Sequence, residues 1–210
     1  MLVHGLAGSS RWWRDVAPSL ALEHSVHLVD LPRWQAYDPD ELVDRIARRF
    51  ADLSPATYIG HSLGGLLSVR LAARHPETVD RLVLVAPAGI PGRSAAGSVV
   101  PLASALLHAG PLFLPRLAVD TLRSGPANVL VAGARLLADD VRPDLTAVQA
   151  PTLLLWGDRD PLIPPDHAQE FLNALPDARL ELIAGASHMP MLERPSEVSR
   201  AVLEFLRAAG

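Results

Sequence analysis

The stretch Thr57-Tyr58-Ile59-Gly60-His61-Ser62-Leu63-Gly64-Gly65 decides the fold of this chain. An apolar run ends in a glycine, and a helical pattern begins directly after the serine. The spacing Gly60-x-Ser62-x-Gly64 predicts a sharp, strained turn from strand to helix, because glycines beside the serine avoid side-chain clashes. Such a turn lifts the Ser62 hydroxyl clear of the sheet and leaves the Leu63 amide unpaired at a helix N-terminus, where it can meet a developing negative charge.

Apolar strand patterns alternate with helical patterns on both sides of this stretch. Predicted strands cover residues 1–3, 26–29, 57–60, 81–85, 152–156 and 179–183. Predicted helices cover residues 11–22, with Ser10 as the N-cap, and residues 39–53, 63–75, 165–175 and 195–207. This alternation predicts an α/β fold with a mostly parallel sheet and helices on both faces. Since ligands of such sheets bind at the carboxyl ends of the strands, the loops after the strands should form one rim.

Residues 91–140 interrupt the alternation. They contain no clear strand and offer apolar helical fragments separated by glycine and proline. Residues 99–119 are apolar enough to raise the question of a membrane span. Pro101, Pro111 and Pro115 fall inside that stretch and favour short, broken helices instead.

Composition limits the classes of function. The chain has 210 residues, 49% of them apolar, and a net charge of -4 without blocks of like charge, so we expect one globular unit that does not bind nucleic acid. There is no cysteine, which removes disulfides and thiolate chemistry. The start shows no signal-peptide pattern, and we expect a cytoplasmic protein. The histidines lack metal-ligand spacing, so neither a metal nor another cofactor is expected, and the oligomeric state is left open.

A nucleophile, a base and an acid all fall on the predicted rim. The Ser62 hydroxyl needs a base to take its proton, and His188 lies in the loop after the last strand. The imidazole in turn needs a carboxylate, and the loop after residues 152–156 supplies Asp158 and Asp160. The order serine, aspartate, histidine is that of one serine-hydrolase architecture.

Four motifs in this order resemble those of the α/β-hydrolase family. They are His4-Gly5, Gly60-His61-Ser62-Leu63-Gly64, Trp156-Gly157-Asp158-Arg159-Asp160 and Gly185-Ala186-Ser187-His188. The resemblance implies that Asp160 is the triad acid and that the amides of Leu6 and Leu63 form an oxyanion hole. It also implies that residues 1–90 and 141–210 form the hydrolase core and that residues 91–140 form a helical cap over the pocket.

Two features depart from the family pattern. The family carries further strands before the oxyanion loop, whereas here Met1 opens that strand, so we expect a sheet without these N-terminal strands. Either the hydrolase is pared down or its natural start lies upstream. By analogy with the family's strand order, residues 26–29 then become an exposed edge. Second, Arg33-Trp34-Gln35-Ala36 replaces a glycine-containing turn of the family.

Other polar residues of the motifs are expected to have structural roles. Asp158 suits a turn or a helix cap, and His4 suits hydrogen bonds within its own loop. His61 is expected to be a spacer that touches the pocket. His108 suits either the substrate channel or a satisfied core position.

The motifs together predict a serine hydrolase that cleaves a carboxylic ester of a small, largely apolar substrate through an acyl-enzyme on Ser62. His188 would act as the base and Asp160 would orient it. One alternative keeps the triad but hydrolyses a carbon–carbon bond of a diketone, or carries out perhydrolysis. Another is a non-catalytic receptor for a small apolar ligand on the same scaffold. We expect a small-molecule ester as the partner and no membrane span.

Overall fold

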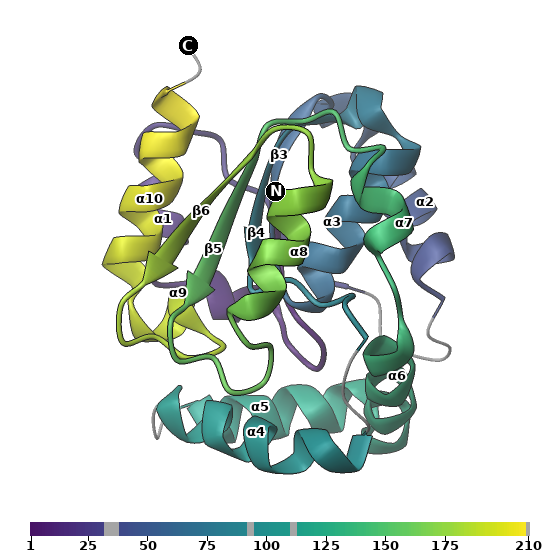
Figure 1. Cartoon of the computed structure of the whole chain (residues 1–210), viewed down its shortest axis with the longest axis vertical. Helices are drawn as coiled ribbons and strands as arrows, with labels where there is room; N and C mark the ends of the chain where they lie inside the picture. The colour runs from purple at the N-terminus through teal and green to yellow at the C-terminus, as the bar shows by residue number, and fades with distance from the viewer. Residues whose placement is uncertain (32–37, 92–94, 110–112, 209–210) are drawn as a thin grey trace.

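Six parallel strands form a sheet at the centre of the computed structural model, which describes residues 1–31, 38–91, 95–109 and 113–208 (Figure 1). The strands are β1 (Leu2–Val3), β2 (Leu28–Val29), β3 (Ala56–His61), β4 (Val79–Val85), β5 (Thr152–Gly157) and β6 (Ala178–Ile183). They lie in the order β2-β1-β3-β4-β5-β6, and every neighbouring pair is parallel. The predicted fold class is therefore confirmed, and β2 lies at the edge of the sheet as expected.

Helices cover both faces of the sheet. The elements outside residues 91–140 are η1 (Ser10–Trp13), α1 (Ala17–Leu20), α2 (Pro39–Arg49), η2 (Ala51–Leu53), α3 (Leu63–Arg74), η3 (Pro76–Thr78), α7 (Arg142–Leu145), α8 (Asp166–Ala174), α9 (Pro190–Glu193) and α10 (Pro195–Arg207). Leu82 and Leu84 of β4 pack in the core that contains α2, α3, α7 and α8. Val83 and Val85 pack in the opposite core, with α1 and α10. Because both faces are buried, the central strands are apolar at successive positions.

The helix predicted for residues 11–22 is divided into η1 and α1. Ser10 does not act as its N-cap, because its amide and hydroxyl bind the carboxylate of Asp30 at 2.6 and 3.1 Å. Pro18 lies in the first turn of α1, where its missing N–H breaks no helical hydrogen bond. The apolar residues of both pieces are buried together, since Trp12 and Leu20 lie in one core.

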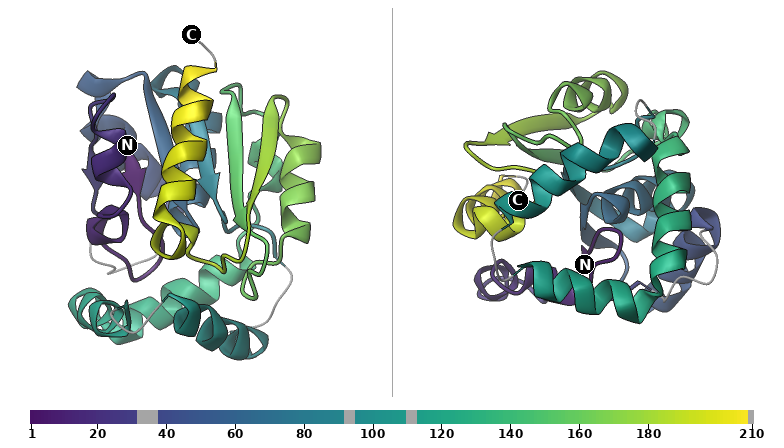
Figure 2. Two further views of the ribbon diagram at one scale, coloured as in Figure 1. Left: turned by 90° about the vertical axis from the view of Figure 1, so that its left-hand side faces the viewer. Right: turned by 90° about the horizontal axis from the view of Figure 1, so that it is seen from below.

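Three further helices lie across the carboxyl ends of the strands: α4 (Ala95–His108), α5 (Phe113–Ser124) and α6 (Pro126–Ala138) (Figures 1 and 2). Helix α6 contacts both α4 and α5. We refer to α4, α5 and α6 as the cap helices. No helix in the described ranges has the length and apolar composition needed to cross a bilayer.

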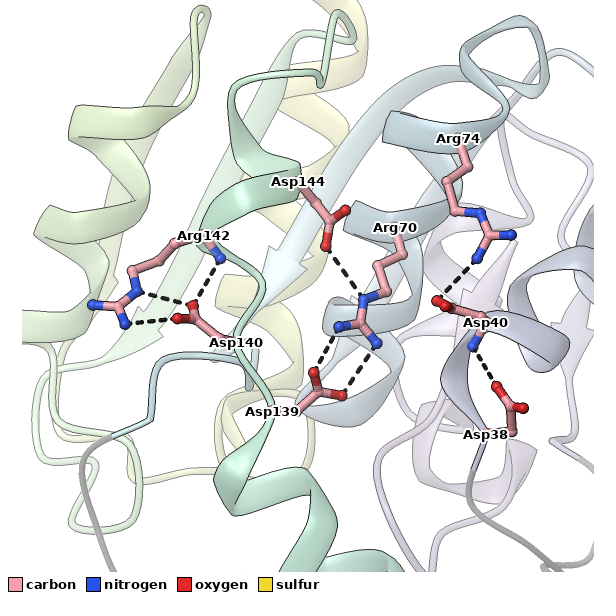
Figure 3. Close-up of polar contacts among 8 residues, drawn as sticks. All are labelled: Asp38, Asp40, Arg70, Arg74, Asp139, Asp140, Arg142 and Asp144. Carbon is pink, nitrogen blue, oxygen red and sulfur yellow. Dashed lines mark hydrogen bonds and ion pairs between the residues drawn. The ribbon is translucent and has the colours of Figure 1, made fainter.

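The two connections between the core and the cap helices lie next to each other. The Val141 amide donates to the Gly89 carbonyl at 2.8 Å, so the two connections run side by side. Arg70 of α3 binds the carboxylate of Asp139 through two nitrogens, at 2.6 and 3.2 Å, and contacts Asp144 at 3.3 Å (Figure 3). These contacts fix the C-terminal end of the cap helices to the helix that follows Ser62.

Candidate active site

Ser62 occupies the turn between β3 and α3. Its φ of 51° and ψ of -113° lie in a region that non-glycine residues rarely adopt. The surrounding backbone holds it there, because the Ser62 amide donates to the Val85 carbonyl at 3.1 Å and the Ser62 carbonyl accepts from the amides of Leu66 and Ala88. A side chain at Gly60 would overlap the backbone of Gly64, which explains why a glycine precedes this turn.

His188 and Asp160 form a buried pair on the same rim. His188 Nδ1 lies 2.8 Å from Asp160 Oδ2, although the residues come from the loops after β6 and β5. The other carboxylate oxygen of Asp160 accepts from the amides of Leu162 and Ile163, both at 2.9 Å. Since a carboxylate only accepts, Nδ1 of His188 donates to Asp160, which leaves Nε2 as the ring nitrogen that can take a proton.

The backbone around His188 is held from two further directions. His61 Nε2 donates to the His188 carbonyl at 2.9 Å, and the two rings lie 4.9 Å apart. The carboxylate of Glu193 accepts from the amides on either side of His188, from Ser187 at 2.8 Å and from Met189 at 3.2 Å. Sequence reasoning missed Glu193. The available signal was an acid in the turn that begins at Pro190 (α9), directly after the histidine loop.

His61 is therefore more than the spacer expected from the sequence. Burial, and then the neighbouring His188, lowers the pKa of His61 well below its usual value. The ring stays neutral, with its Nε2 proton committed to the His188 carbonyl.

The loop after β1 packs directly on the Ser62 turn. A Cβ atom at Gly5 would lie 2.8 Å from His61 Nδ1 and 3.3 Å from Ser62 Cβ. His4 stabilises this loop, as expected: its Nε2 accepts from the Leu31 amide at 3.1 Å, and its Nδ1 then donates to the Gly5 carbonyl at 2.8 Å. Burial lowers the pKa of His4, which favours this neutral form.

The amides of Leu6 and Leu63 face no acceptor among the described residues, since neither donates a hydrogen bond there. Leu6 follows Gly5 in the loop that packs on Ser62, and Leu63 is the first residue of α3. Both N–H groups thus remain available to an oxygen atom of a bound molecule.

Ser62 and His188 do not share a hydrogen bond within the described part of the chain. Ser62 is adjacent in sequence to His61, whose ring packs against that of His188. Hydrogen bonds between a nucleophile and its base often tighten only when substrate binds. The acid and the base are thus hydrogen-bonded to each other, and the serine turn lies beside them. The serine itself is not hydrogen-bonded to the base among the described residues.

Other residues near the site make structural contacts. Asp158 accepts from the Gly185 amide at 2.7 Å and so joins the acid loop to the histidine loop. His108 is exposed and contacts the carbonyl of Ser104 in its own helix, so it is not a core residue. Trp12 is buried and its ring lies 5.1 Å from that of Phe113 on α5. The replaced turn at 33–36 lies outside the described residues.

No cluster of histidine, aspartate and glutamate suited to a metal ion exists among the described residues. Two cavities, of about 270 and 910 Å³, lie near the β2 edge, away from Ser62 and His188. The smaller is lined mainly by β1, the start of β3 and the segment before β2, and the larger by β2 and α2; neither lining includes the Ser62 turn.

Comparisons with known proteins identify related hydrolases. The chain is 33% identical to a pimeloyl-[acyl-carrier protein] methyl ester esterase of Chromobacterium violaceum, over 98% of this chain and 93% of that protein. It is 30% identical to RutD of Pseudomonas savastanoi pv. phaseolicola, a candidate carbamate hydrolase, over 99% and 93% of the two chains. A thermophilic esterase from Thermogutta terrifontis has the same fold, with a TM-score of 0.80 and 21% identity over 99% of this chain and 88% of that one. The family model described as the alpha/beta hydrolase family matches residues 1–201, and the chain belongs to that family.

Proposed function

We propose that this protein is a serine hydrolase that cleaves a carboxylic ester of a small, largely apolar substrate. The observation that carries the proposal is the buried pair of His188 and Asp160 beside the strained Ser62 turn. A relative that is 33% identical and named as a methyl ester esterase supports an ester as the substrate class.

The proposed reaction begins with attack of Ser62 Oγ on the ester carbonyl carbon. His188 Nε2 takes the hydroxyl proton, and Asp160 stabilises the imidazolium that forms. The amides of Leu6 and Leu63 donate to the oxyanion of the tetrahedral intermediate. His188 then passes the proton to the leaving alcohol, and water, activated by the same histidine, releases the acyl group from Ser62.

Residues 91–140 act as a cap over the pocket in this proposal, on a core formed by residues 1–90 and 141–210. The cap helices lie across the rim that carries Ser62 and His188 (Figure 1). Their apolar composition supports an apolar acyl or alcohol portion, because binding pockets bury matching surface.

The decisive experiment compares Ser62→Ala with Ser187→Ala. Ser187 is buried next to His188, and its hydroxyl has no hydrogen-bond partner among the described residues, so its loss should change activity little. Ser62→Ala should abolish turnover of a chromogenic short-chain ester and labelling by a fluorophosphonate probe, while its thermal unfolding matches that of the wild type.

Three results would contradict the proposal or favour one of its alternatives. Turnover that survives Ser62→Ala would exclude Ser62 as the nucleophile. Probe labelling without turnover of any ester in a panel would favour a ligand receptor. Preference for a diketone or for peroxide as the acyl acceptor would favour the carbon–carbon hydrolase or the perhydrolase.

A further inference from the structure

The loop after β1 has a strained backbone. We call residues 4–9 the Leu6 loop, because they carry the Leu6 amide. Ala7 has a φ of 56°, in the left-handed region that alanine rarely adopts. Such a conformation persists only where neighbouring contacts hold it. One contact is internal, since the Gly8 amide donates to the Gly5 carbonyl at 3.1 Å. Any further contact that holds this loop also holds the Leu6 amide in place.

Helix α5 contacts the end of the Leu6 loop through Asp120. The Ser9 hydroxyl donates to Asp120 Oδ2 at 2.8 Å, although the two residues are 111 positions apart in the sequence. Asp120 is 4% exposed, so its carboxylate is largely removed from water and depends on partners within the protein. Ser9 precedes η1, yet its side chain caps no amide of that helix. The hydroxyl is thus bonded to a cap helix instead of its own.

Helix α6 contacts the same loop on the other side of Ala7. A Cβ atom at Gly133 would lie 3.3 Å from Leu6 Cδ2, so the Leu6 side chain packs on the helix where the helix has no side chain of its own. Leu6 also packs against the core cluster to which α6 contributes Leu136. Leu6 and Ser9, which flank the strained residue, thus each contact a different cap helix.

The charge of Asp120 also acts on His4, the first residue of the Leu6 loop. Burial lowers the pKa of His4, and its hydrogen bond to the Gly5 carbonyl opposes that shift. The charges of Asp30 and Asp120 oppose it as well, since a nearby carboxylate favours the protonated ring. Asp120 therefore interacts with both ends of the loop, with Ser9 through a hydrogen bond and with His4 through its charge.

We propose that Asp120 is a positioning residue, which holds the Leu6 loop so that the Leu6 amide stays beside Ser62 to bind the oxyanion. The inference rests on the proposed function, because the oxyanion belongs to that reaction. Loss of one oxyanion donor typically lowers kcat about 10²- to 10³-fold, and a loosened donor should cost part of this. A contact that only fastened the cap would instead affect stability and leave kcat unchanged.

A double-mutant cycle in the full chain tests the proposal. Ser9→Ala and Asp120→Ala should each lower kcat for a short-chain ester about tenfold, and the double variant should lose no more, because all three lack the same bond. Asp120→Asn keeps an oxygen that can accept from Ser9, so kcat should recover to within about threefold of the wild type. A trifluoromethyl ketone, whose carbonyl carbon bonds to Ser62 Oγ and whose oxygen becomes an oxyanion, should bind more weakly by the factor by which kcat/KM falls.

Ser10→Ala is the matched control for Ser9→Ala. The adjacent Ser10 hydroxyl also donates to a carboxylate, but to that of Asp30, which lies after β2 and not on a cap helix. Its kcat should equal that of the wild type, and circular dichroism should confirm that all variants are folded. If Asp120→Ala does not fold, Ser9→Ala still decides the question, because it removes only a partly buried hydroxyl.

Hydrogen exchange measures the loop apart from catalysis. The Gly8 amide, which donates within the loop, should exchange faster in Ser9→Ala, whereas the amides of β5 should not. Faster exchange without a loss of kcat would make the bond a purely structural one and overturn the inference. Independent effects in the double variant, or no loss of kcat in either single variant, would also overturn it. Wild-type protein that hydrolyses no ester of a panel would contradict the proposed function itself, which is a different result.

Discussion

The surroundings of His188 and the cap helices are stabilised by different interactions. Around His188, buried polar groups are joined by short hydrogen bonds to Asp160, His61 and Glu193. The cap helices are instead apolar on both sides and are tied to the core by a few polar contacts, among them Ser9 with Asp120 and Arg70 with Asp139. A site that transfers protons needs atoms at fixed positions. A helical cap needs apolar surface for packing and ends that are attached to the core. The comparison therefore predicts that substitutions near His188 mainly affect catalysis and that substitutions at the Arg70 attachment of the cap helices mainly affect stability.

The largest expected effect is that of Asp160→Asn. The amide no longer holds the His188 tautomer that leaves Nε2 free, and in other serine–histidine–aspartate sites this change lowers kcat about 10⁴-fold. Asp158→Asn is the control, because Asp158 lies in the same loop but binds the Gly185 amide. We expect less than about a tenfold loss there, as for removal of a single structural hydrogen bond. A greater loss of kcat for Asp158→Asn, measured on the same ester, would show that the acid is wrongly assigned.

Arg70→Met tests the attachment of the cap. The Arg70 side chain is 13% exposed, and its loss leaves the carboxylates of Asp139 and Asp144 without this guanidinium (Figure 3). Breaking such a largely buried ion pair should lower the free energy of unfolding by about 3 kcal/mol.

Arg142→Gln provides the comparison for Arg70→Met. The Arg142 side chain is 49% exposed and pairs with Asp140 and Glu170 on the surface, so we expect a loss below about 1 kcal/mol. Urea unfolding measures both variants. Equal losses would mean that Arg70 does not anchor the cap more strongly than a surface pair does.

Local pattern was enough to predict the central fold. The carboxyl-terminal halves of β3 and β4 and the whole of β5 are buried on both faces, and the edge position of β2 followed from the family's strand order. The pairing of Asp160 with His188 was also accessible, since both follow strands and parallel strands bring their ends to one rim.

Contacts between segments that are distant in the sequence could not be predicted in the same way. Ser10 does not cap a helix at residues 11–22 because Asp30, which follows β2, binds its amide and hydroxyl. The hydrogen bond that His61 donates depends on the position of the His188 carbonyl, more than a hundred residues away in the chain. Glu193 was missed because one acid in a turn does not reveal which amides it will meet.

Glu193 offers a further test of the hydrogen bonds around His188. Glu193→Ala removes the acceptor of the Ser187 and Met189 amides, so we expect His188 to lose its fixed position and kcat to fall about 10- to 100-fold. KM should change little, since Glu193 is not proposed to touch substrate. Glu193→Gln keeps one acceptor oxygen and should recover part of the loss. Glu197→Ala, in the exposed first turn of α10, is the control. A loss confined to KM, or no recovery with glutamine, would contradict this role.

The smallest expected effect is a dependence of stability on pH. The pKa of His61 is lowered in the folded protein, first by burial, so below about pH 6.5 the unfolded chain binds a proton that the folded protein does not. Stability is then complete above that pH and falls as the pH decreases, by at most about 1.4 kcal/mol per pH unit for this proton. His4, whose pKa is also lowered, adds in the same direction. His61→Gln keeps a donor toward the His188 carbonyl but cannot titrate, so its unfolding free energy should decrease less steeply between about pH 6.5 and 5. Parallel curves for the two proteins would show that His61 is not held neutral by the fold.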